Sequence, residues 1–348
     1  MPAALRSACC VVLALVVLEG DRGDAQAPPL PERLDRLLAD VVRATAAERR
    51  QLHAGGPITV MLNGDPTRVV SVFGAIWINA SPRSYVEAAQ DIERFERGGK
   101  FRITRRISDP PRLGDFAALR LPSEDVADLA RCRPGSCEIK LSQAALEAMH
   151  RRVDFRAASP HLQVNAFFRE QMLDLTRRYR AQGNAALPVY HDRAQPTLVA
   201  HEFRDMLAGM PAIEGARPEV RRSLMDYPRA TLPNARDLLY WQDVSFGLKP
   251  TIRVSHLVIA EAPDQTVVAS KMLYASHYFV TALELRVLLP DPARGSGFWF
   301  LTVSTSRVDG LSGFTGFFVR RRVRGDVERG IATMLAATRR RLEDGRGQ

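Results

Sequence analysis

The stretch TIRVSHLVIAE, residues 251–261, begins the part of the chain that decides the fold. Apolar side chains recur there at every second position, which is the period of a β-strand with one buried face: Ile252, Val254, Val258 and Ala260. His256 falls in phase with this apolar set, whereas Arg253 and Ser255 point the other way. The pattern therefore predicts a strand whose inward face carries a histidine.

Two further β-type runs follow, at residues 266–289 and 298–307. In the first, His277 lies in phase with an apolar set comprising Leu273, Ala275, Phe279, Leu283, Leu285, Val287 and Leu289. In the second, Arg307 lies in phase with Trp299, Leu301 and Val303. Because turn-rich segments separate the three runs, we expect an antiparallel meander with one face in solvent.

Aligning the apolar faces of the last two runs predicts which residues lie opposite one another. This alignment places His277 opposite Asp309, and Phe279 opposite Arg307. An inward-facing arginine needs an acid or a ligand oxygen, because an unpaired buried charge is costly. His256, His277, Arg307 and Asp309 therefore form either a closed structural network or a ligand site.

A long amphipathic helix is expected after the glycine-rich segment 309–313. Apolar or small residues recur there at steps of three and four: Val323, Val327, Ile331, Leu335, Thr338 and Leu342. Such a stripe has to be buried, and the predicted sheet is the surface that can bury it.

The order of elements adds a resemblance to a known superfamily. The strand Ile76-Trp77-Ile78-Asn79 leads through Ala80-Ser81-Pro82 into a helix that continues to 91–95, and residues 256–343 supply the meander and the last helix. This order resembles the helix-grip fold of the START and polyketide-cyclase-like superfamily. The resemblance implies an α+β fold in which a curved antiparallel sheet grips a long C-terminal helix, with a cavity for an apolar or lipid-like ligand. The helical middle, about 142–230, would be an insertion.

The first 27 residues have the features of a secretory signal peptide. Arg6 precedes the apolar run 8–18, and small residues offer cleavage after Ala25 or Ala27. We therefore expect a periplasmic or secreted protein. The expected organisation is a signal peptide, an N-terminal amphipathic helix, the helix-grip-like domain and a tail, at 1–27, 28–56, 57–343 and 344–348.

The cysteines are interpreted in the light of this expected export. Cys9 and Cys10 would leave with the signal peptide, so the mature chain would keep Cys132 and Cys137. Pro134-Gly135 between them favours a turn, and an oxidising compartment favours a disulfide. The four-residue spacing fits neither a two-residue redox motif nor a complete zinc site.

The chain is basic, with a formal net charge of +10, but the positive residues are spread along it. One dense cluster, Arg320-Arg321-Arg322 with Arg324, lies at the start of the last helix. Such a cluster can contact an anionic membrane surface or form a solvated helix face. Nucleic acid is not expected as a partner of an exported protein.

Cofactor and catalytic motifs are not found. In His201-Glu202-Phe203-Arg204-Asp205 the position of the second histidine of a zinc helix holds Asp205, and we predict no metal site. Tyr190-His191-Asp192 contains a His-Asp pair of the kind that a general base needs, but adjacent residues usually point apart, so an ordinary polar loop is the preferred interpretation. The sequence has no phosphate loop, dinucleotide fingerprint or Gly-x-Ser-x-Gly, so no cofactor is predicted.

The resulting hypothesis is an exported protein that binds an apolar or amphipathic small molecule between the sheet and the last helix. The predicted ligand-binding residues are His256, His277, Arg307, Asp309, Trp241 and Phe279. An enzyme, a hydrolase or cyclase-like catalyst using His277 and Asp309 as acid and base, is a second interpretation. A scaffold for envelope partners, with a filled core, is a third.

Overall fold

The computed structural model describes residues 28–210, 218–230, 232, 234–245, 248–309 and 313–345, without the side chains of 313–323. The predicted signal peptide therefore lies outside the described residues. Within these ranges eight strands form one antiparallel sheet, in the order β1-β2-β10-β9-β8-β7-β6-β3. Their bounds are β1 Ile58–Met61, β2 Val69–Ile78, β3 Phe101–Ile107, β6 Arg236–Val244, β7 Thr251–Ala262, β8 Gln265–Ala275, β9 Phe279–Pro290 and β10 Phe298–Val308.

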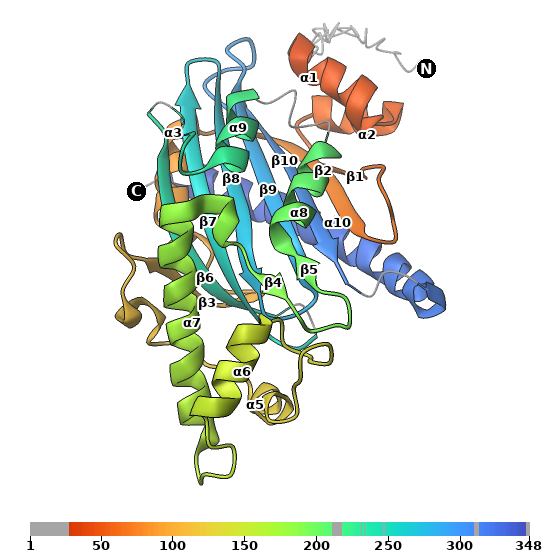
Figure 1. The fold of residues 1–348 in the computed structure, drawn as a ribbon. Coiled ribbons are helices and arrows are strands. Elements are labelled where there is room, and N and C mark those ends of the chain that lie inside the picture. Colours follow the sequence, from red (N-terminus) through yellow and green to blue (C-terminus); the bar gives the residue numbers. More distant parts are fainter. Residues whose placement is uncertain are drawn as a thin grey trace, which may run out of the picture.

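Helices cover both faces of the sheet (Figure 1). On one face lie α3 (Pro82–Gln90), α4 (Ile92–Phe95) and α10 (Gly313–Asp344). The other face carries α1 (Glu32–Arg36), η1 (Leu37–Val42), α2 (Ala46–His53), α7 (Pro160–Gln182), α8 (Val199–Ala208) and α9 (Pro218–Asp226). The expected α+β fold, with a curved antiparallel sheet, a long C-terminal helix and a helical insertion, is confirmed.

Shorter elements complete the insertion and its approaches. They are η2 (Leu113–Phe116), α5 (Ser123–Leu129), α6 (Gln143–Arg152), η3 (Gly183–Ala186) and the small two-stranded sheet of β4 (Val189–Tyr190) and β5 (Thr197–Leu198). No helix in the described ranges is long and apolar enough to cross a membrane.

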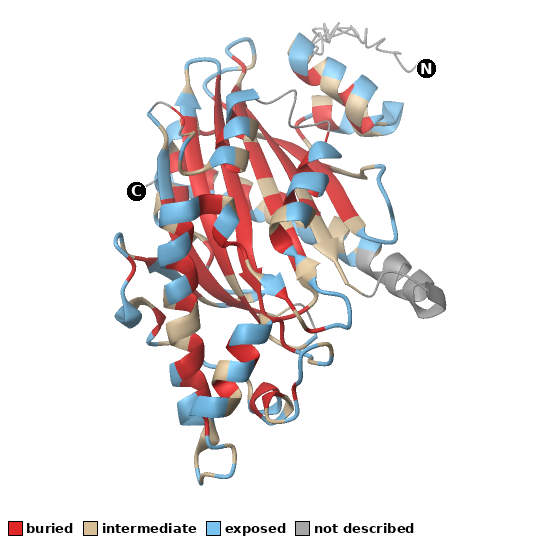
Figure 2. Cartoon of the chain, in the orientation of Figure 1, coloured by how far each residue is buried: buried red, intermediate tan, exposed pale blue. Residues whose placement is uncertain are grey.

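The expectation that one sheet face lies in solvent is wrong. Every residue of β8 is buried, and Figure 2 shows buried positions across the whole sheet. Ser255 and Arg286, whose phase suggested a wet face, are themselves buried. The period of a strand separates its two faces, but it does not show that each face is covered by helices from elsewhere in the chain.

The run 266–289 is not one strand. It forms β8 and β9, which are joined by a tight turn at Ser276–Tyr278, where Tyr278 has a φ of 59°. His277 therefore lies in the turn and not on an apolar strand face. The predicted register is also wrong, since Arg307 pairs with Thr281, and Phe279 pairs with Val308 beyond a bulge.

The last helix packs on the sheet as its stripe predicts. Leu335, Thr338 and Leu342 are buried, whereas the side chain of Val323 lies outside the described residues. A Cβ on Gly74 of β2 would lie 2.6 Å from Ile331 Cγ2, so glycine permits this close approach. The side chains of Arg320–Arg322 are also outside the described residues, and their contact with a membrane surface stays a prediction.

The single amphipathic helix expected within residues 28–56 is interrupted. Arg43 adopts a left-handed conformation with a φ of 56° after η1, and α2 then begins behind Thr45. The Thr45 side chain accepts a hydrogen bond from the Glu48 backbone N–H, and the Glu48 carboxylate accepts one from the Thr45 backbone N–H. This reciprocal capping box starts a new helix and explains the break.

Cys132 and Cys137 form the predicted disulfide, which closes a small loop between α5 and α6. Thiol titration of processed, denatured protein is therefore expected to detect no free thiol, and reduction should release both. Because the loop is short, Cys132→Ser should cost only about 2 kcal/mol on the chain-entropy model. Two titratable thiols before reduction would contradict the pairing.

Candidate functional site

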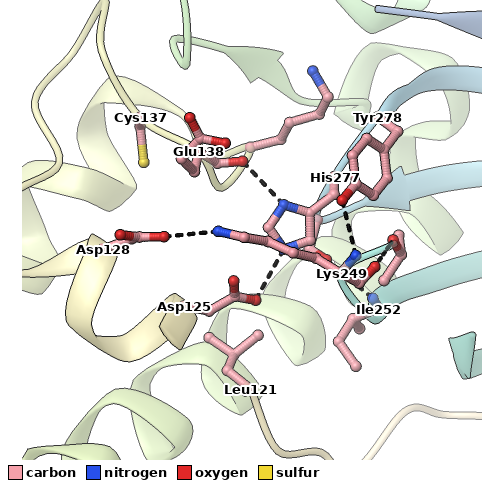
Figure 3. Close-up of polar contacts among 12 residues, drawn as sticks. Leu121, Asp125, Asp128, Cys137, Glu138, Lys249, Ile252, His277 and Tyr278 are labelled. Carbon is pink, nitrogen blue, oxygen red and sulfur yellow. Dashed lines mark hydrogen bonds and ion pairs between the residues drawn. The ribbon is translucent and has the colours of Figure 1, made fainter. Parts of the chain in front are cut away.

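His277 is held by oxygen atoms at both ring nitrogens (Figure 3). Its Nδ1 lies 3.1 Å from the Glu138 carbonyl oxygen, and its Nε2 lies 2.9 Å from Asp125 Oδ2. A carbonyl only accepts, so Nδ1 carries a proton, and Nε2 faces a carboxylate oxygen. His277 is buried and has no free nitrogen to act as a base.

The surroundings of His277 tie the β8–β9 turn to α5 and to the disulfide loop that follows it. The Lys249 ammonium donates to Asp128 of α5 at 2.9 Å, and the Lys249 backbone N–H donates to the Tyr278 hydroxyl at 3.0 Å. Glu138 directly follows the disulfide-bonded Cys137. These contacts, drawn in Figure 3, join four chain segments into a structural clamp: α5, the segment at Glu138, the segment at Lys249 and the β8–β9 turn.

Asp309 pairs with a lysine and not with His277. Lys140 is buried, and its ammonium lies between the Asp192 carboxylate, at 3.0 Å, and that of Asp309. The Asp309 backbone N–H donates to the Tyr278 carbonyl at 2.8 Å. The acid–base pair of His277 and Asp309 is therefore not formed.

Arg307 keeps the strand phase that the sequence predicts, but it faces α8. Its guanidinium pairs with the Glu202 carboxylate, which also lies 3.3 Å from Arg68 Nη2. Burial raises the pKa of Glu202, and the charge of Arg68 opposes this rise. The ion pair lies on the sheet face opposite α10, because Arg307 shares the phase of Leu301 and Val303, which pack in the core beneath α8.

His256 belongs to a chain of hydrogen bonds that runs from the buried Tyr179 to the exposed Asp237. Its Nε2–H donates to Asp237 Oδ2 at 2.8 Å, and Nδ1 accepts from the Tyr179 hydroxyl at 3.0 Å. Burial lowers the pKa of His256, although Asp237 opposes the shift. A hydroxyl, an imidazole and a carboxylate are the parts of a nucleophilic relay. Tyr179 is fully buried, however, so no substrate can reach its hydroxyl in this conformation.

The two aromatic candidates lie in different places. Trp241 is buried on the α7 face, and its indole N–H donates to the Asp115 carbonyl at 2.8 Å. Phe279, the first residue of β9, is half-buried. The six residues selected from the sequence therefore do not line a common cavity between the sheet and α10.

A polar cluster that the sequence analysis did not select does face α10. Gly74 pairs with Thr302, and Thr302 pairs with Arg286, so the three residues share one face of the sheet. Gly74 lies directly against Ile331 and Leu335 of α10. Arg286 therefore projects from the middle of the sheet toward the side that the last helix covers.

Arg286 is only partly satisfied. Its Nη2 donates to Glu284 at 2.6 Å and approaches Glu96 at 3.4 Å. Its Nε and Nη1 are buried without a hydrogen-bond partner among the described residues, and so is the hydroxyl of Tyr85 on α3. Arg286 as a whole residue is only 5% exposed, and the two unused donor nitrogens are themselves buried, so bulk water does not satisfy them.

Neighbouring side chains extend this cluster across three strands. Glu96 accepts from Gln242 Nε2 at 2.5 Å, and Gln242 Oε1 accepts from Arg253 at 2.6 Å. The Thr104 hydroxyl lies 3.2 Å from Gln242 Nε2. We call Tyr85, Glu96, Thr104, Gln242, Arg253, Glu284 and Arg286 the grip cluster.

The charges in the grip cluster act on one another. Burial alone would raise the pKa of Glu284, but Arg286, Lys100 and Arg253 together lower it. Burial raises the pKa of Tyr85 to about 12, with partial opposition from Arg286. Glu284 nevertheless keeps 31% of its side chain accessible, although β9 is a central strand. Solvent therefore reaches the middle of this sheet face.

The sequence did contain a signal for the grip cluster. Glu284 and Arg286 alternate with apolar residues in β9. Such alternation is typical of a solvent-exposed face, and only the packing of α3, α4 and α10 shows that it is enclosed.

Comparisons with known proteins do not assign a function. No model of a known protein family matches the chain, and no curated protein is significantly similar to it. In the described parts of the chain, no group of three or more potential metal ligands is gathered in one place.

Proposed function

We propose that the protein is exported and binds a small amphipathic molecule between the sheet and α10, with an anionic group held by Arg286. The observation that carries this proposal is the buried guanidinium with two unused donor nitrogens. Leaving such donors unpaired costs about 1–3 kcal/mol each, and more for a charged group. A bound carboxylate or phosphate would satisfy them.

The chemistry of the cluster favours an anion. Guanidinium groups bind carboxylate and phosphate oxygens through paired N–H donors. The Tyr85 hydroxyl, whose pKa is raised to about 12, stays protonated and supplies another donor close to Arg286. Both side chains are therefore suited to one negatively charged head group.

The surroundings favour a ligand that also has an apolar part. Leu288 lies two residues from Arg286 on the same face and pairs with Phe300. Both are buried in the core formed with α3 and α10. The resemblance to helix-grip proteins, which bind ligands between sheet and last helix, supports the same location.

The test compares Arg286→Met with Arg307→Met, an arginine on the opposite face of the same sheet. Small molecules extracted from protein purified from its native host are identified by mass spectrometry. Dodecanoate, dodecanol and dodecylamine then serve as defined probes in calorimetry. We expect wild-type protein and Arg307→Met to bind dodecanoate best, and Arg286→Met to bind it roughly 10–100-fold more weakly, as for loss of a charge-assisted hydrogen bond.

Tyr85→Phe should weaken dodecanoate binding by a smaller factor, because it removes one neutral donor. Equal binding of the three probes, or equal losses in both arginine variants, would contradict an anion site at Arg286. The enzyme interpretation has less support, since His256 and His277 are bonded at both nitrogens and buried.

A further inference from the structure

A separate cavity of about 320 Å³ lies at the edge of the sheet, between β3, β6 and the segment that leads into α5. Its lining includes Trp241, Leu121 and Pro250 as apolar walls, together with Asp243, Arg102 and Arg120. Asp243 shares the strand phase of Trp241, so it projects from the face opposite Gln242 and the grip cluster. The volume is within the range of small-molecule sites, about 300–1,000 Å³.

Asp243 is the exceptional residue of this cavity. Its side chain is only 9% exposed, and its Oδ1 is buried without a hydrogen-bond partner among the described residues. Its Oδ2 lies 3.7 Å from Arg102 Nη1, which is too long for a hydrogen bond. Burial raises the pKa of Asp243, and Arg102 only partly opposes the rise.

The other charged groups in the lining are differently placed. Arg102 is about half exposed, and Glu124 is exposed. Arg120 is exposed and already donates to the carbonyls of Ala117 and Leu119, at 2.7 and 2.8 Å. Among the described lining residues, Asp243 is thus the buried charged group whose unpaired oxygen indicates a ligand site.

We propose that this cavity binds a small primary or secondary ammonium compound with an apolar body. An ionised carboxylate only accepts hydrogen bonds, so Asp243 Oδ1 needs a donor. An ammonium group donates and also neutralises the buried charge, which a neutral hydroxyl does not. Trp241, Leu121 and Pro250 offer apolar contact to the carbon skeleton, and a flat aromatic or alicyclic body suits these walls.

An anionic ligand is disfavoured by the same geometry. It would approach the unpaired oxygen of Asp243, and like charges at contact distance repel in a partly desolvated site. Arg120 is already engaged by two carbonyls, so it contributes less to such a ligand. The site therefore selects for positive charge.

The test uses three probes with one phenyl body: 2-phenylethylamine, 2-phenylethanol and 3-phenylpropionate. Calorimetry at pH 7.5 should show the amine binding at least tenfold more tightly than the alcohol, with the carboxylate weakest. Asp243→Asn should reduce amine binding at least tenfold and leave alcohol binding within about twofold. The matched control, Glu124→Gln, removes an exposed acid from the same lining and should change amine binding less than twofold.

A second variant, Ala118→Phe, keeps the proposal testable if Asp243→Asn does not fold. Ala118 is a half-buried residue of the lining, and Ala118→Phe should fill the cavity and abolish binding of both amine and alcohol. Amine binding that is unchanged in Asp243→Asn, or no preference for the amine, would overturn the proposal. Asp243 would then be a hydrated carboxylate that binds no ligand. Dodecanoate binding at Arg286 should be unaffected by either variant, so this test is independent of the function proposed above.

Discussion

The effect of Lys271→Met on the free energy of unfolding is expected to depend on pH. Relative to the wild type, the variant should become less stable by roughly 4 kcal/mol as the pH rises from 7 to 10. Lys271 is fully buried in β8, with its ammonium 4.3 Å from the centre of the Phe203 ring. Asn184 Oδ1 accepts from it, but no acidic side chain in the described ranges forms an ion pair with it. Burial lowers the pKa of Lys271 to about 7.

The sign follows from the two states. The unfolded chain holds this proton up to about pH 10.4, whereas the folded protein releases it above about pH 7. Below pH 7 the full cost of burying the charged form is present. Between pH 7 and pH 10.4 the unfolded state binds more protons, so the contribution of Lys271 becomes less unfavourable as the pH rises.

Urea unfolding of both proteins at pH 7, 8.5 and 10 measures this difference. Methionine also leaves Asn184 Oδ1 without its donor, but that loss is independent of pH and cancels when the pH values are compared. Lys249→Met is the control: the hydrogen bond to Asp128 raises the pKa of Lys249, so its effect should stay constant over this range. A pH-independent difference for Lys271→Met would show that the buried amine does not titrate near neutrality.

The last third of the chain was predictable where local pattern decides structure. The stripe that includes Leu335 and Leu342 identified α10, and alternation in 251–261 identified β7. Even the inward phase of Arg307 was correct, because side chains in a strand alternate strictly between two faces. These features depend on residues a few positions apart.

The turn at His277 shows why the site was not predictable. Ser276-His277-Tyr278 contains no glycine, proline or asparagine, so it carries none of the strong hairpin signals, and the apolar period continues through it. Missing the turn made one strand from two and moved His277 onto an apolar face. The register of Arg307 then shifted, and Asp309 was paired with the wrong residue.

The sequence pattern mainly failed to predict which distant segments supply the interaction partners of these residues. Glu202 reaches Arg307 from the helical insertion, and Lys140 reaches Asp309 from the segment just before it; the strand pattern could place neither against the sheet. The face that was expected to be wet is the one that carries Arg286, and α3, α4 and α10 enclose it, whereas the insertion covers the opposite, apolar face. Alternation reports only that two faces differ, so which polar face becomes a binding surface depends on long-range packing.

Asp125→Ala is expected to destabilise the protein by about 3–5 kcal/mol, because it strips a buried histidine of its acidic partner. Asp125 is fully buried, and its Oδ2 is the partner within hydrogen-bond distance of His277 Nε2. With alanine at this position, Nε2 faces a small void and stays unpaired. The β8–β9 turn would then lose its link to α5.

Asp125→Asn separates loss of the hydrogen bond from loss of the charge. With a neutral imidazole, Nδ1–H still donates to the Glu138 carbonyl, and the new amide N–H can donate to Nε2. This variant should therefore be clearly more stable than Asp125→Ala in urea unfolding. Asp128→Ala, which removes the partly exposed partner of Lys249, should cost only up to about 1 kcal/mol. A contradictory result would be that Asp125→Ala lowers the free energy of unfolding no more than Asp128→Ala does. In that case the contacts around His277 would not hold the turn, and the burial of His277 would have to be explained by packing alone.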